Sequence, residues 1–326
     1  MKALTYRRYG GPEGLEIEEL PRPEPREREV LIRVHAASIN AADRVLLRGE
    51  PFLVRLGMGF PRPRHRTLGF DVAGRVEAVG RGVTQFRAGD NVFGASKFGA
   101  FAEFVCVNQE TLVPKPAGVS FEEAAATPTA GYTALQGLSK GRIAAGQKVL
   151  VDGASGGVGT FAIQIAKAYG ADITAVCSTR NVGIAHALGA SRVIDYRHED
   201  LTRDGQRYDL ILAANAYRPL SDYRRVLKPD GAYVMTGGGG VQILQAMLLG
   251  ALISMTSSRR ISNIMAVATK KDLIVLRELL ETGKIKPVID RTVALNQVPD
   301  AIRHIEEDHA RGKVVVRVSG ERLAGA

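Results

Sequence analysis

Cysteine is scarce in this sequence: Cys106 and Cys177 are the only two among 326 residues. Two thiols exclude a fold held together by several disulfide bonds, and they exclude a zinc lobe built from four thiolates of one chain. Cys177 closes an apolar stretch, so we expect it to pack as a small core residue rather than to act as a reactive thiol. The chemistry of this protein must therefore be sought in other side chains.

Long apolar runs are also missing. A membrane-spanning helix needs a run of about 18 apolar residues. The most apolar segment, Ile243–Met255, is shorter and contains Gln245. The N-terminal MKALTYRRYGG has no apolar core of the kind that a secretory signal peptide carries. We therefore expect a cytoplasmic protein without a membrane span.

Acidic residues are fewer than basic ones, 34 against 44, which gives a formal charge of +10. Such a field attracts anions, nucleic acid included. The basic residues are dispersed, however, and the densest run, Phe60–Arg66 (FPRPRHR), lies in the Pro-rich loop 55–66 without interleaved aromatics. A solvated loop is the favoured interpretation, and an anion or nucleic-acid site is the alternative. Because no recognised nucleic-acid module accompanies the run, we do not expect nucleic acid as a partner.

The order of apolar patterns along the chain predicts an α/β protein with two domains. The first third reads as short strands with glycine turns, which is typical of a compact barrel or sandwich. After Ser120 the pattern becomes helical, and from Gln147 strands and helices alternate. Continuous apolar strands separated by helices indicate a parallel sheet covered on both faces. The last strand, GKVVVRV (312–318), could rejoin the first domain and make it discontinuous.

A glycine-rich turn follows the first strand of the alternating region, within a β-α-β unit. Glycines without Cβ atoms let the backbone approach a pyrophosphate, and the N–H groups at the start of the next helix can receive its charge. A tight turn without a ligand is the alternative. Four glycines in seven residues would cost stability without a purpose, so we predict dinucleotide binding. The predicted cofactor residues of this turn are Gly153, Ser155, Gly156, Gly157, Val158 and Gly159.

The end of the second strand lacks a carboxylate where NAD sites carry an Asp or Glu for the ribose 2′-hydroxyl. Ser178, Thr179 and Arg180 stand there instead. Two hydroxyls and a guanidinium suit a 2′-phosphate, which a carboxylate would repel. The sequence therefore favours NADP over NAD, and a solvated Arg180 with poor selectivity is the alternative. Tyr196, at the end of the next strand, could lie near the same phosphate or pack on the adenine, or it could be a half-buried strand residue.

Two further strand ends are candidates for cofactor contact. Asn215 ends the fourth strand, and four glycines, Gly237–Gly240, end the fifth. Ligands of open parallel sheets lie outside the carboxyl ends of the strands. We therefore include Asn215, Gly237 and Gly238 as predicted contacts of the nicotinamide half, with a mobile glycine loop as the alternative.

Together and in order, several motifs resemble the medium-chain dehydrogenase/reductase superfamily, specifically its zinc-free quinone oxidoreductase branch. The resemblance covers essentially the whole chain and rests on AASINAAD, LGFDVAGRVEAVG, FRAGDNVFG, AAATPTAGYTAL, DGASGGVG and HARGKVVVRV. It implies a GroES-like β-barrel catalytic domain, residues 1–122 and 267–326, and a doubly wound parallel-sheet Rossmann domain that binds NADP, residues 123–266.

The departures from zinc-dependent relatives predict that no metal is bound. Those enzymes carry a Cys where this chain has Asn40, and a Gly-His-Glu where it has Gly69-Phe70-Asp71. Without the thiolate and the imidazole, a catalytic zinc with three protein ligands cannot assemble there. Alcohol oxidation then lacks its Lewis acid. Hydride transfer from NADPH to a quinone or an α,β-unsaturated carbonyl remains open to such a site.

By resemblance, Asn40, Asp43 and Thr129 line the nicotinamide end of the cleft and form the predicted catalytic set. Asn40 would bond the cofactor or the substrate carbonyl, and Thr129 would hold the nicotinamide or its ribose. Asp43 is expected mainly to order the loop. No proton donor is evident, since Tyr132 is a candidate by position only and packing in its helix is the preferred interpretation.

Three further expectations complete the sequence prediction. The apolar residues Phe52, Leu53, Val54, Leu56 and Phe60 form a lid over an apolar substrate or pack within a long loop. A homodimer could extend the nucleotide-domain sheet through LISMTSSRR (252–260), which rests mainly on the resemblance. A non-enzymatic NADPH-binding sensor or nucleic-acid-binding protein is the alternative to a reductase.

Overall fold

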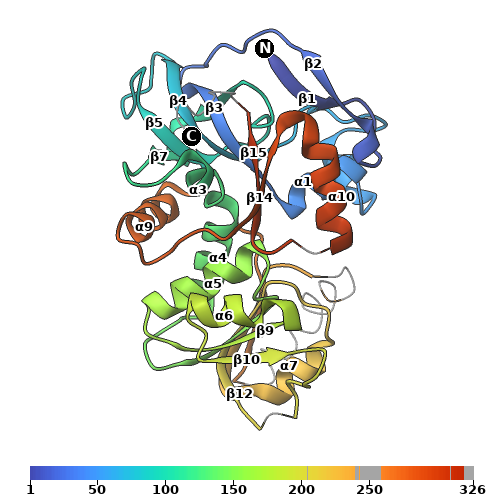
Figure 1. Cartoon of the computed structure of the whole chain (residues 1–326), viewed down its shortest axis with the longest axis vertical. Helices are drawn as coiled ribbons and strands as arrows, with labels where there is room; N and C mark the ends of the chain where they lie inside the picture. The colour runs from blue at the N-terminus through green and yellow to red at the C-terminus, as the bar shows by residue number, and fades with distance from the viewer. Residues whose placement is uncertain (204, 239–241, 243–257, 309, 319–326) are drawn as a thin grey trace. The chain divides into compact units, whose positions relative to one another are not determined.

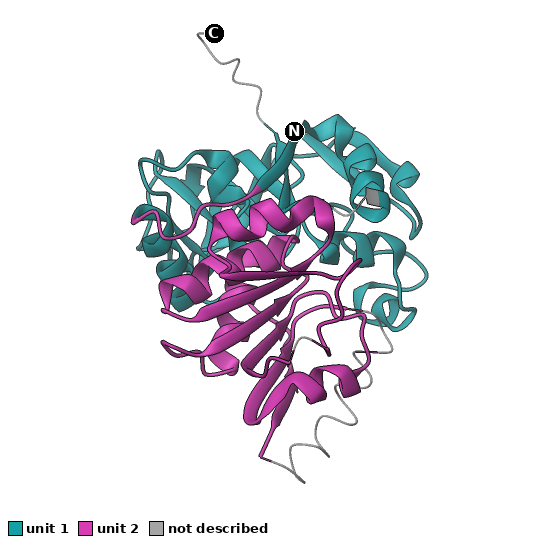
Figure 2. Cartoon of the chain, turned by 60° about the horizontal axis from the view of Figure 1, so that its bottom comes forward, with its two compact units in different colours: residues 1–129, 268–281, 289–326 teal, residues 130–267, 282–288 magenta. Residues whose placement is uncertain are grey.

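The computed structural model describes residues 1–203, 205–238, 242, 258–308 and 310–318. The chain divides into two compact units, shown in teal and magenta in Figure 2. Unit 1 consists of residues 1–129, 268–281 and 289–326, and unit 2 consists of residues 130–267 and 282–288.

Unit 2 is built on a parallel sheet, which has six strands in the described part of the chain. These are β8 (Lys148–Asp152), β9 (Asp172–Cys177), β10 (Arg192–Asp195), β11 (Tyr208–Ala213), β12 (Leu227–Met235) and β13 (Arg260–Asn263). Their order across the sheet is β10-β9-β8-β11-β12-β13. In chain order this is 3-2-1-4-5-6, the arrangement of the doubly wound dinucleotide-binding fold. The predicted Rossmann sheet is confirmed.

The helices of unit 2 precede or connect these strands (Figure 1). They are α4 (Pro128–Lys140), α5 (Gly157–Ala168), the 3₁₀ turn η3 (Thr179–Asn181), α6 (Val182–Leu188) and α7 (Leu220–Val226). Helix α5 packs on β8 and β9, and its residues from Gly159 to Ala166 are buried. This explains why its sequence is apolar on nearly every side. The core of the unit contains three fully buried tyrosines, Tyr208, Tyr223 and Tyr233.

Unit 1 is mainly β-structure. Its strands are β1 (Lys2–Tyr6), β2 (Leu15–Glu19), β3 (Glu29–Ile39), β4 (Asp71–Val79), β5 (Asn91–Ala95), β6 (Phe104–Asn108), β7 (Leu112–Pro114), β14 (Ile289–Ala294) and β15 (Lys313–Arg317). Its helices and 3₁₀ turns are η1 (Pro12–Gly14), α1 (Ala41–Arg48), α2 (Leu53–Met58), η2 (Gln109–Thr111), α3 (Phe121–Ala125), α9 (Lys270–Glu281), η4 (Leu295–Gln297) and α10 (Val298–Asp308).

Strand β3 organises unit 1 by pairing with three other strands. Its first half, Glu29–Arg33, pairs with β6, its last residues, Ala36–Ile39, pair with β15, and most of its length pairs with β4. The register of the pairing with β4 shifts between Leu31 and Ile32 and between Val34 and Ala36. Such bulges bend a strand and increase its twist. The last strand of the chain therefore does return to the first unit.

The observed unit boundaries differ from the predicted ones at 122/123 and 266/267. Residues 123–129 belong to unit 1 because α3 packs on β3, β4, β5 and β15. Residues 282–288 belong to unit 2 because the Gln164 side chain pairs with the backbone of Lys286, accepting from its N–H at 2.8 Å and donating to its carbonyl at 3.0 Å. These packing contacts are not visible in the strand and helix pattern of the sequence.

The helical segment after Ser120 also differs from its prediction. Ser120 caps α3, since its Oγ accepts from the Glu123 N–H at 3.1 Å. The helix ends at Ala125, and α4 begins at Pro128. Proline has no N–H and its ring clashes with the carbonyl four residues earlier, so one continuous helix is excluded.

Most of the segment predicted to mediate a dimer, 252–260, lies outside the described residues. Only Ser258, Arg259 and Arg260 of this segment are described. Gly239 and Gly240 of the glycine run also lie outside them. Among the helices that are described, none combines the length and the apolar composition that crossing a bilayer requires.

Candidate functional site

The glycine turn lies where β8 of unit 2 ends and α5 begins. Gly153 has φ = +78°, a conformation that favours glycine. A Cβ atom on Gly153 would lie 2.6 Å from Cβ of Asn215, and one on Gly159 would lie 2.2 Å from the Gly153 carbonyl. Two of the glycines are therefore required by the packing of the turn itself. The turn also brings Gly153 beside Asn215, a predicted site residue 62 positions later in the sequence.

Gly156 differs from these two glycines. Its backbone is extended, and a Cβ atom there would have only the Gly153 carbonyl within 4 Å, at 3.6 Å. Gly156 is the N-cap of α5, and no side chain caps this helix. The N–H groups of an uncapped first turn are suited to an anion. This open glycine beside an uncapped helix end fits the pyrophosphate of a dinucleotide.

The other predicted cofactor residues of unit 2 follow the same edge of the sheet. Ser178 and Tyr196 follow β9 and β10, whose last residues, Cys177 and Asp195, are in register. Asn215 follows β11, and Gly237 and Gly238 follow β12. The parallel sheet thus collects residues predicted separately from five segments at its carboxyl edge, the position at which this fold binds nucleotides.

Ser178 has a buried neighbour that sequence reasoning missed. Asn181 is 3% exposed, and its Nδ2 donates to Ser178 Oγ at 3.1 Å. Because Ser178 accepts this hydrogen bond, its own hydroxyl hydrogen remains available for an anion. Oδ1 of Asn181 is buried without a hydrogen-bond partner. An unsatisfied buried acceptor beside a predicted ligand site is a second observation that fits a bound cofactor.

Thr179 is placed differently from its prediction as a phosphate donor. Its side chain is hydrogen-bonded to Asp195, and this bond is the main cause that holds the pKa of the Asp195 carboxyl below its usual value. Asp195 also accepts from the Arg197 N–H at 3.1 Å and has His198 at 3.9 Å. The sheet edge near Ser178 therefore carries the carboxylate of Asp195, which the sequence prediction did not include, and the charge of Arg197 acts on this carboxylate. Arg180 and Tyr196 are exposed there.

The glycines after β12 have a packing reason. A Cβ atom on Gly237 would lie 2.6 Å from the Ala214 carbonyl. Gly238 has φ = +149° and forms a parallel bridge with Ala216. Both glycines allow the ends of β11 and β12 to approach closely. Their predicted role in cofactor contact stays a prediction.

In unit 1, Asn40 and Asp43 lie at the junction of β3 and α1. Asp43 is fully buried, and its carboxylate accepts from the backbone N–H groups of Asn40 and Gly69, both at 2.8 Å. These bonds tie the start of α1 to the loop before β4. Burial raises the pKa of Asp43 to about 7, against the opposing effect of the two N–H donors. Asp43 thus orders two segments, the main role expected from the sequence.

The centre of this cluster is Asp71, the first residue of β4, which is fully buried. Its Oδ2 accepts from Ser38 Oγ at 2.7 Å and from Asn40 Nδ2 at 2.9 Å. Its Oδ1 accepts from the backbone N–H of Thr129 at 2.9 Å and from Thr129 Oγ1 at 2.6 Å. The structure therefore brings Asn40 and Thr129, 89 positions apart in the sequence, to opposite oxygens of one carboxylate.

Lys313 completes the cluster from the first position of β15. Its side chain is 4% exposed. Nζ donates to the Ile39 carbonyl at 3.1 Å, to Asn40 Oδ1 at 2.5 Å and to Asp71 Oδ2 at 3.4 Å. Burial lowers the pKa of Lys313, and the charges of Asp71 and Asp43 oppose this effect. Every ammonium hydrogen thus has an acceptor, as a buried charge requires.

Sequence reasoning missed the roles of Asp71 and Lys313, although both lie in motifs that carried the family resemblance. A signal was present. Lys313 directly precedes three valines in the last strand, and Asp71 opens the apolar stretch DVAG. Charged residues at the entrance of buried strands seldom remain there without a partner.

The apolar loop of unit 1 is mostly exposed. Phe52, Leu53, Leu56 and Phe60 are 56%, 73%, 59% and 62% exposed, whereas Val54 packs against the core of the unit. Phe52 and Phe60 also contact each other edge to face, with 5.8 Å between their ring centroids. In the basic loop, Arg62, Arg64 and Arg66 are exposed, as expected of a solvated loop. Tyr132, the candidate by position, is 8% exposed.

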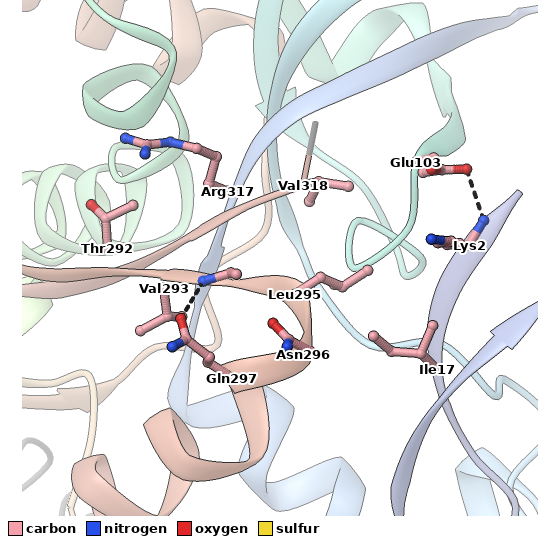
Figure 3. Close-up of a pocket in the computed structure, with 11 residues that line it drawn as sticks. Lys2, Ile17, Glu103, Thr292, Val293, Leu295, Asn296, Gln297, Arg317 and Val318 are labelled. Atoms are coloured by element: carbon pink, nitrogen blue, oxygen red, sulfur yellow. Dashed lines mark hydrogen bonds between the residues drawn. The ribbon is translucent and has the colours of Figure 1, made fainter. Parts of the chain in front are cut away.

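A pocket of about 570 Å³ lies elsewhere in unit 1 (Figure 3). It is lined by Lys2, Ile17, Glu103, Thr292, Val293, Ala294, Leu295, Asn296, Gln297, Arg317 and Val318. Glu103 accepts from the backbone N–H of Lys2 at 2.8 Å. None of the predicted site residues lines this pocket, so we do not assign the predicted chemistry to it.

Within the part of the chain that the structure describes, no three His, Cys, Asp or Glu side chains gather in a way that could hold a metal ion.

Comparison with known proteins gives two family models that match this chain. The description of the first is alcohol dehydrogenase GroES-like domain, matching residues 26–117, and that of the second is zinc-binding dehydrogenase, matching residues 188–316. The first match lies within unit 1, and the second extends across the described strands from β10 to β15.

Similar proteins match along nearly the whole chain. A chloroplast envelope quinone oxidoreductase homolog of Arabidopsis thaliana is 34% identical, over 97% of this chain and 98% of that protein. A chloroplastic NADPH-dependent alkenal/one oxidoreductase of the same plant is 32% identical, over 97% and 79%. The solved quinone oxidoreductase of Coxiella burnetii superposes with a TM-score of 0.87 at 31% identity, over 98% and 99%.

Proposed function

Because this chain belongs to the quinone oxidoreductase branch of the medium-chain dehydrogenase/reductase superfamily, we propose that it transfers hydride from NADPH to a quinone or an α,β-unsaturated carbonyl. The observation that carries the proposal is the carboxyl edge of the unit 2 sheet, where an open glycine lies beside the uncapped start of α5. The names of the relatives supply the acceptor classes, and they do not favour a non-enzymatic sensor or nucleic-acid-binding protein.

Cofactor binding is assigned to unit 2. NADPH, when bound, supplies a hydride from its nicotinamide ring. The turn Gly153–Gly159 and the first N–H groups of α5 would hold the pyrophosphate. Ser178 would donate its hydroxyl, and Arg180 its guanidinium, to the 2′-phosphate. The preference for NADPH over NADH rests on these two donors, and the Asp195 carboxylate beside them opposes it.

The chemistry of the acceptor follows from the residue types of unit 1. Quinones and enones accept hydride without a metal to polarise them. Removal of hydride from a simple alcohol, in contrast, relies on a metal as Lewis acid. Asn40 and Thr129 are the polar side chains that the resemblance assigns to the nicotinamide end. They are held by a buried carboxylate and a buried ammonium rather than by metal ligands. We therefore propose a zinc-free reductase.

The direct test is oxidation of NADPH by the purified protein with a panel of quinones and enals. Turnover with at least one class, and faster turnover with NADPH than with NADH, is expected. Tight NADPH binding without turnover on any acceptor would contradict the proposal. The zinc content of the same preparation, measured by mass spectrometry, should lie far below one atom per chain, and chelators should leave the rate unchanged.

Two finer expectations belong to the same proposal. We propose that the protein forms a homodimer, which sedimentation equilibrium tests. We propose a cytoplasmic location, which cell fractionation tests. The segment thought to connect the protomers, 252–260, lies mostly outside the described residues, so its contribution rests on the sequence.

A further inference from the structure

We propose that the exposed segment 51–66 of unit 1 docks on an anionic lipid bilayer, with its apolar side chains entering the headgroup region and its arginines contacting lipid phosphates. The segment lies wholly within unit 1. The inference goes beyond the proposed function, since neither NADPH nor an electron acceptor takes part in the docking. The side chains that form this docking surface are Phe52, Leu53, Leu56, Phe60, Arg62 and Arg64.

The apolar part of the docking surface is contiguous. Phe52 precedes α2 and Phe60 follows it, and their rings meet edge to face. Leu53 and Leu56 lie three positions apart in α2, the spacing that places two side chains on one side of a helix. Each of these four side chains is more than half exposed. Apolar side chains gathered in this way mark interaction sites, whereas single exposed ones need no explanation.

The segment is held in place by its own polar contacts. Nε of Arg55 donates to the Gly49 carbonyl at 3.0 Å, and its guanidinium lies over the ring of Tyr9, 5.1 Å from the centroid. The Tyr9 hydroxyl donates to the Gly59 carbonyl at 2.7 Å. Val54 packs against the core of unit 1. The ordered contacts thus face the protein, and the exposure of the four apolar side chains is built into the segment.

Positive charge stands beside the apolar side chains. The segment 51–66 contains four arginines and no aspartate or glutamate. Arg62 and Arg64 are exposed, and neither forms an ion pair within the described part of the chain. The backbone N–H of Arg64 donates to the Met58 carbonyl at 2.9 Å, which keeps this arginine at the end of α2. Guanidinium groups without a carboxylate partner are suited to phosphate.

A lipid bilayer fits this combination better than nucleic acid does. Nucleic acid offers phosphates to the arginines, and its bases can stack on aromatic rings, but it offers nothing to exposed leucines. An anionic bilayer presents phosphates at its surface and hydrocarbon just below them. Helix α2 has six residues, far fewer than the about 20 that cross a bilayer, so the contact is confined to the interface.

The test is co-sedimentation of the full-length protein with vesicles of phosphatidylcholine, prepared with and without phosphatidylglycerol. We expect the protein to pellet with the anionic vesicles and to remain in the supernatant with the neutral ones. Rising salt should release part of the bound protein, because it screens the charges of the arginines and the lipids. Vesicle binding needs no cofactor, so oxidation of NADPH by the same preparation tests the proposed function separately.

Leu53→Ser/Leu56→Ser tests the apolar contact. This double variant should bind anionic vesicles about tenfold more weakly, because two apolar side chains no longer leave water. Met265→Ser/Val267→Ser is the matched control, since both of these side chains are more than half exposed and lie in unit 2. All four positions are accessible to solvent, so both variants should fold, which circular dichroism checks.

Arg62→Gln/Arg64→Gln tests the charges. It should weaken binding to anionic vesicles by about 25-fold, since an arginine near an anionic surface contributes about fivefold. The salt dependence of the remaining binding should be smaller. Arg224→Gln/Arg225→Gln removes two exposed arginines of α7 in unit 2 and is the matched control, which should bind nearly as the wild-type protein does.

Three results would overturn the inference. The first is failure of the wild-type protein to pellet with anionic vesicles. The second is an equal loss of binding in the variants of segment 51–66 and in their controls, which would indicate adsorption through the overall charge of the protein. The third is binding to duplex DNA or RNA that requires the two arginines and not the two leucines, without vesicle binding, which would assign the surface to nucleic acid.

Discussion

The hydroxyl of Tyr223 in α7 donates a 2.5 Å hydrogen bond to Oδ2 of Asp152, the last residue of β8. Both side chains are buried, and Asp152 directly precedes the glycine turn. Burial raises the pKa of Asp152, and the bond from Tyr223 opposes this rise. Burial likewise raises the pKa of Tyr223, and the Asp152 charge adds to the effect. The phenol of Tyr223 thus stabilises the carboxylate that precedes the cofactor turn, together with the backbone N–H of Gly153 and the charge of Arg218.

Tyr223→Phe is expected to destabilise the protein by about 1–3 kcal/mol at pH 7, because it leaves a buried carboxylate oxygen without its donor. The folded-state pKa of Asp152 should then rise further. The destabilisation is therefore largest where Asp152 is ionised and shrinks as the pH falls. Urea unfolding at several pH values measures this, with Tyr217→Phe, at a 63% exposed tyrosine, as the control. An equal loss in both variants would contradict the assigned bond.

Asp43 predicts a pH dependence of stability. Its pKa is about 7 in the folded protein, raised from 3.8. Between these values the folded state holds a proton that the unfolded state releases, so the stabilisation is fully present below pH 3.8 and is lost as the pH rises through 7. Asp43 is thus expected to make the unfolding free energy fall as the pH rises through this window. Asp43→Asn should remove this fall, and an unchanged slope would show that another group titrates.

Arg180→Ala is expected to weaken the binding of NADPH by about 10- to 100-fold, the range for a lost charge-assisted hydrogen bond. NADH lacks the 2′-phosphate, so its binding should change little. Dissociation constants for both cofactors measure the difference, and rising salt should reduce it. Equal losses for NADPH and NADH would mean that Arg180 does not contact the phosphate.

Gly156→Ala tests whether Gly156 serves the binding of the cofactor rather than the packing of the turn. Its extended backbone tolerates a side chain, and the only neighbour of the added methyl is 3.6 Å away, so stability should change by less than about 1 kcal/mol. The methyl would enter the space assigned to the pyrophosphate and weaken NADPH and NADH alike by about tenfold. Gly183→Ala, in α6 with nothing within 4 Å, is the matched control. Unaltered cofactor affinity in Gly156→Ala would place the pyrophosphate elsewhere.

The parallel sheet, its strand ends and the glycine turn could be predicted from the sequence because their signals are local. Apolar runs, caps and glycines act over a few residues, so β8, α5 and the strands after them were recognisable one at a time. Strand order then follows from the general rules of this fold, which bring Ser178, Tyr196 and Asn215 to one edge. Even here, the assignment of residues 282–288 to unit 2 depended on packing. The helix break before Pro128, in contrast, follows from a local signal, the missing N–H and the ring of proline.

The cluster in unit 1 shows what the sequence could not decide. Asn40 and Thr129 were identified by resemblance, but the direction of their hydrogen bonds depends on Asp71 and on Lys313, which is 242 positions beyond Asp71. Only the pairing of β15 with β3 brings that lysine to the asparagine. The sequence alone determines which polar groups exist. The tertiary structure decides which of them are used up inside the protein and which remain for a ligand, because each hydrogen can be donated only once and each buried charge must find its partners.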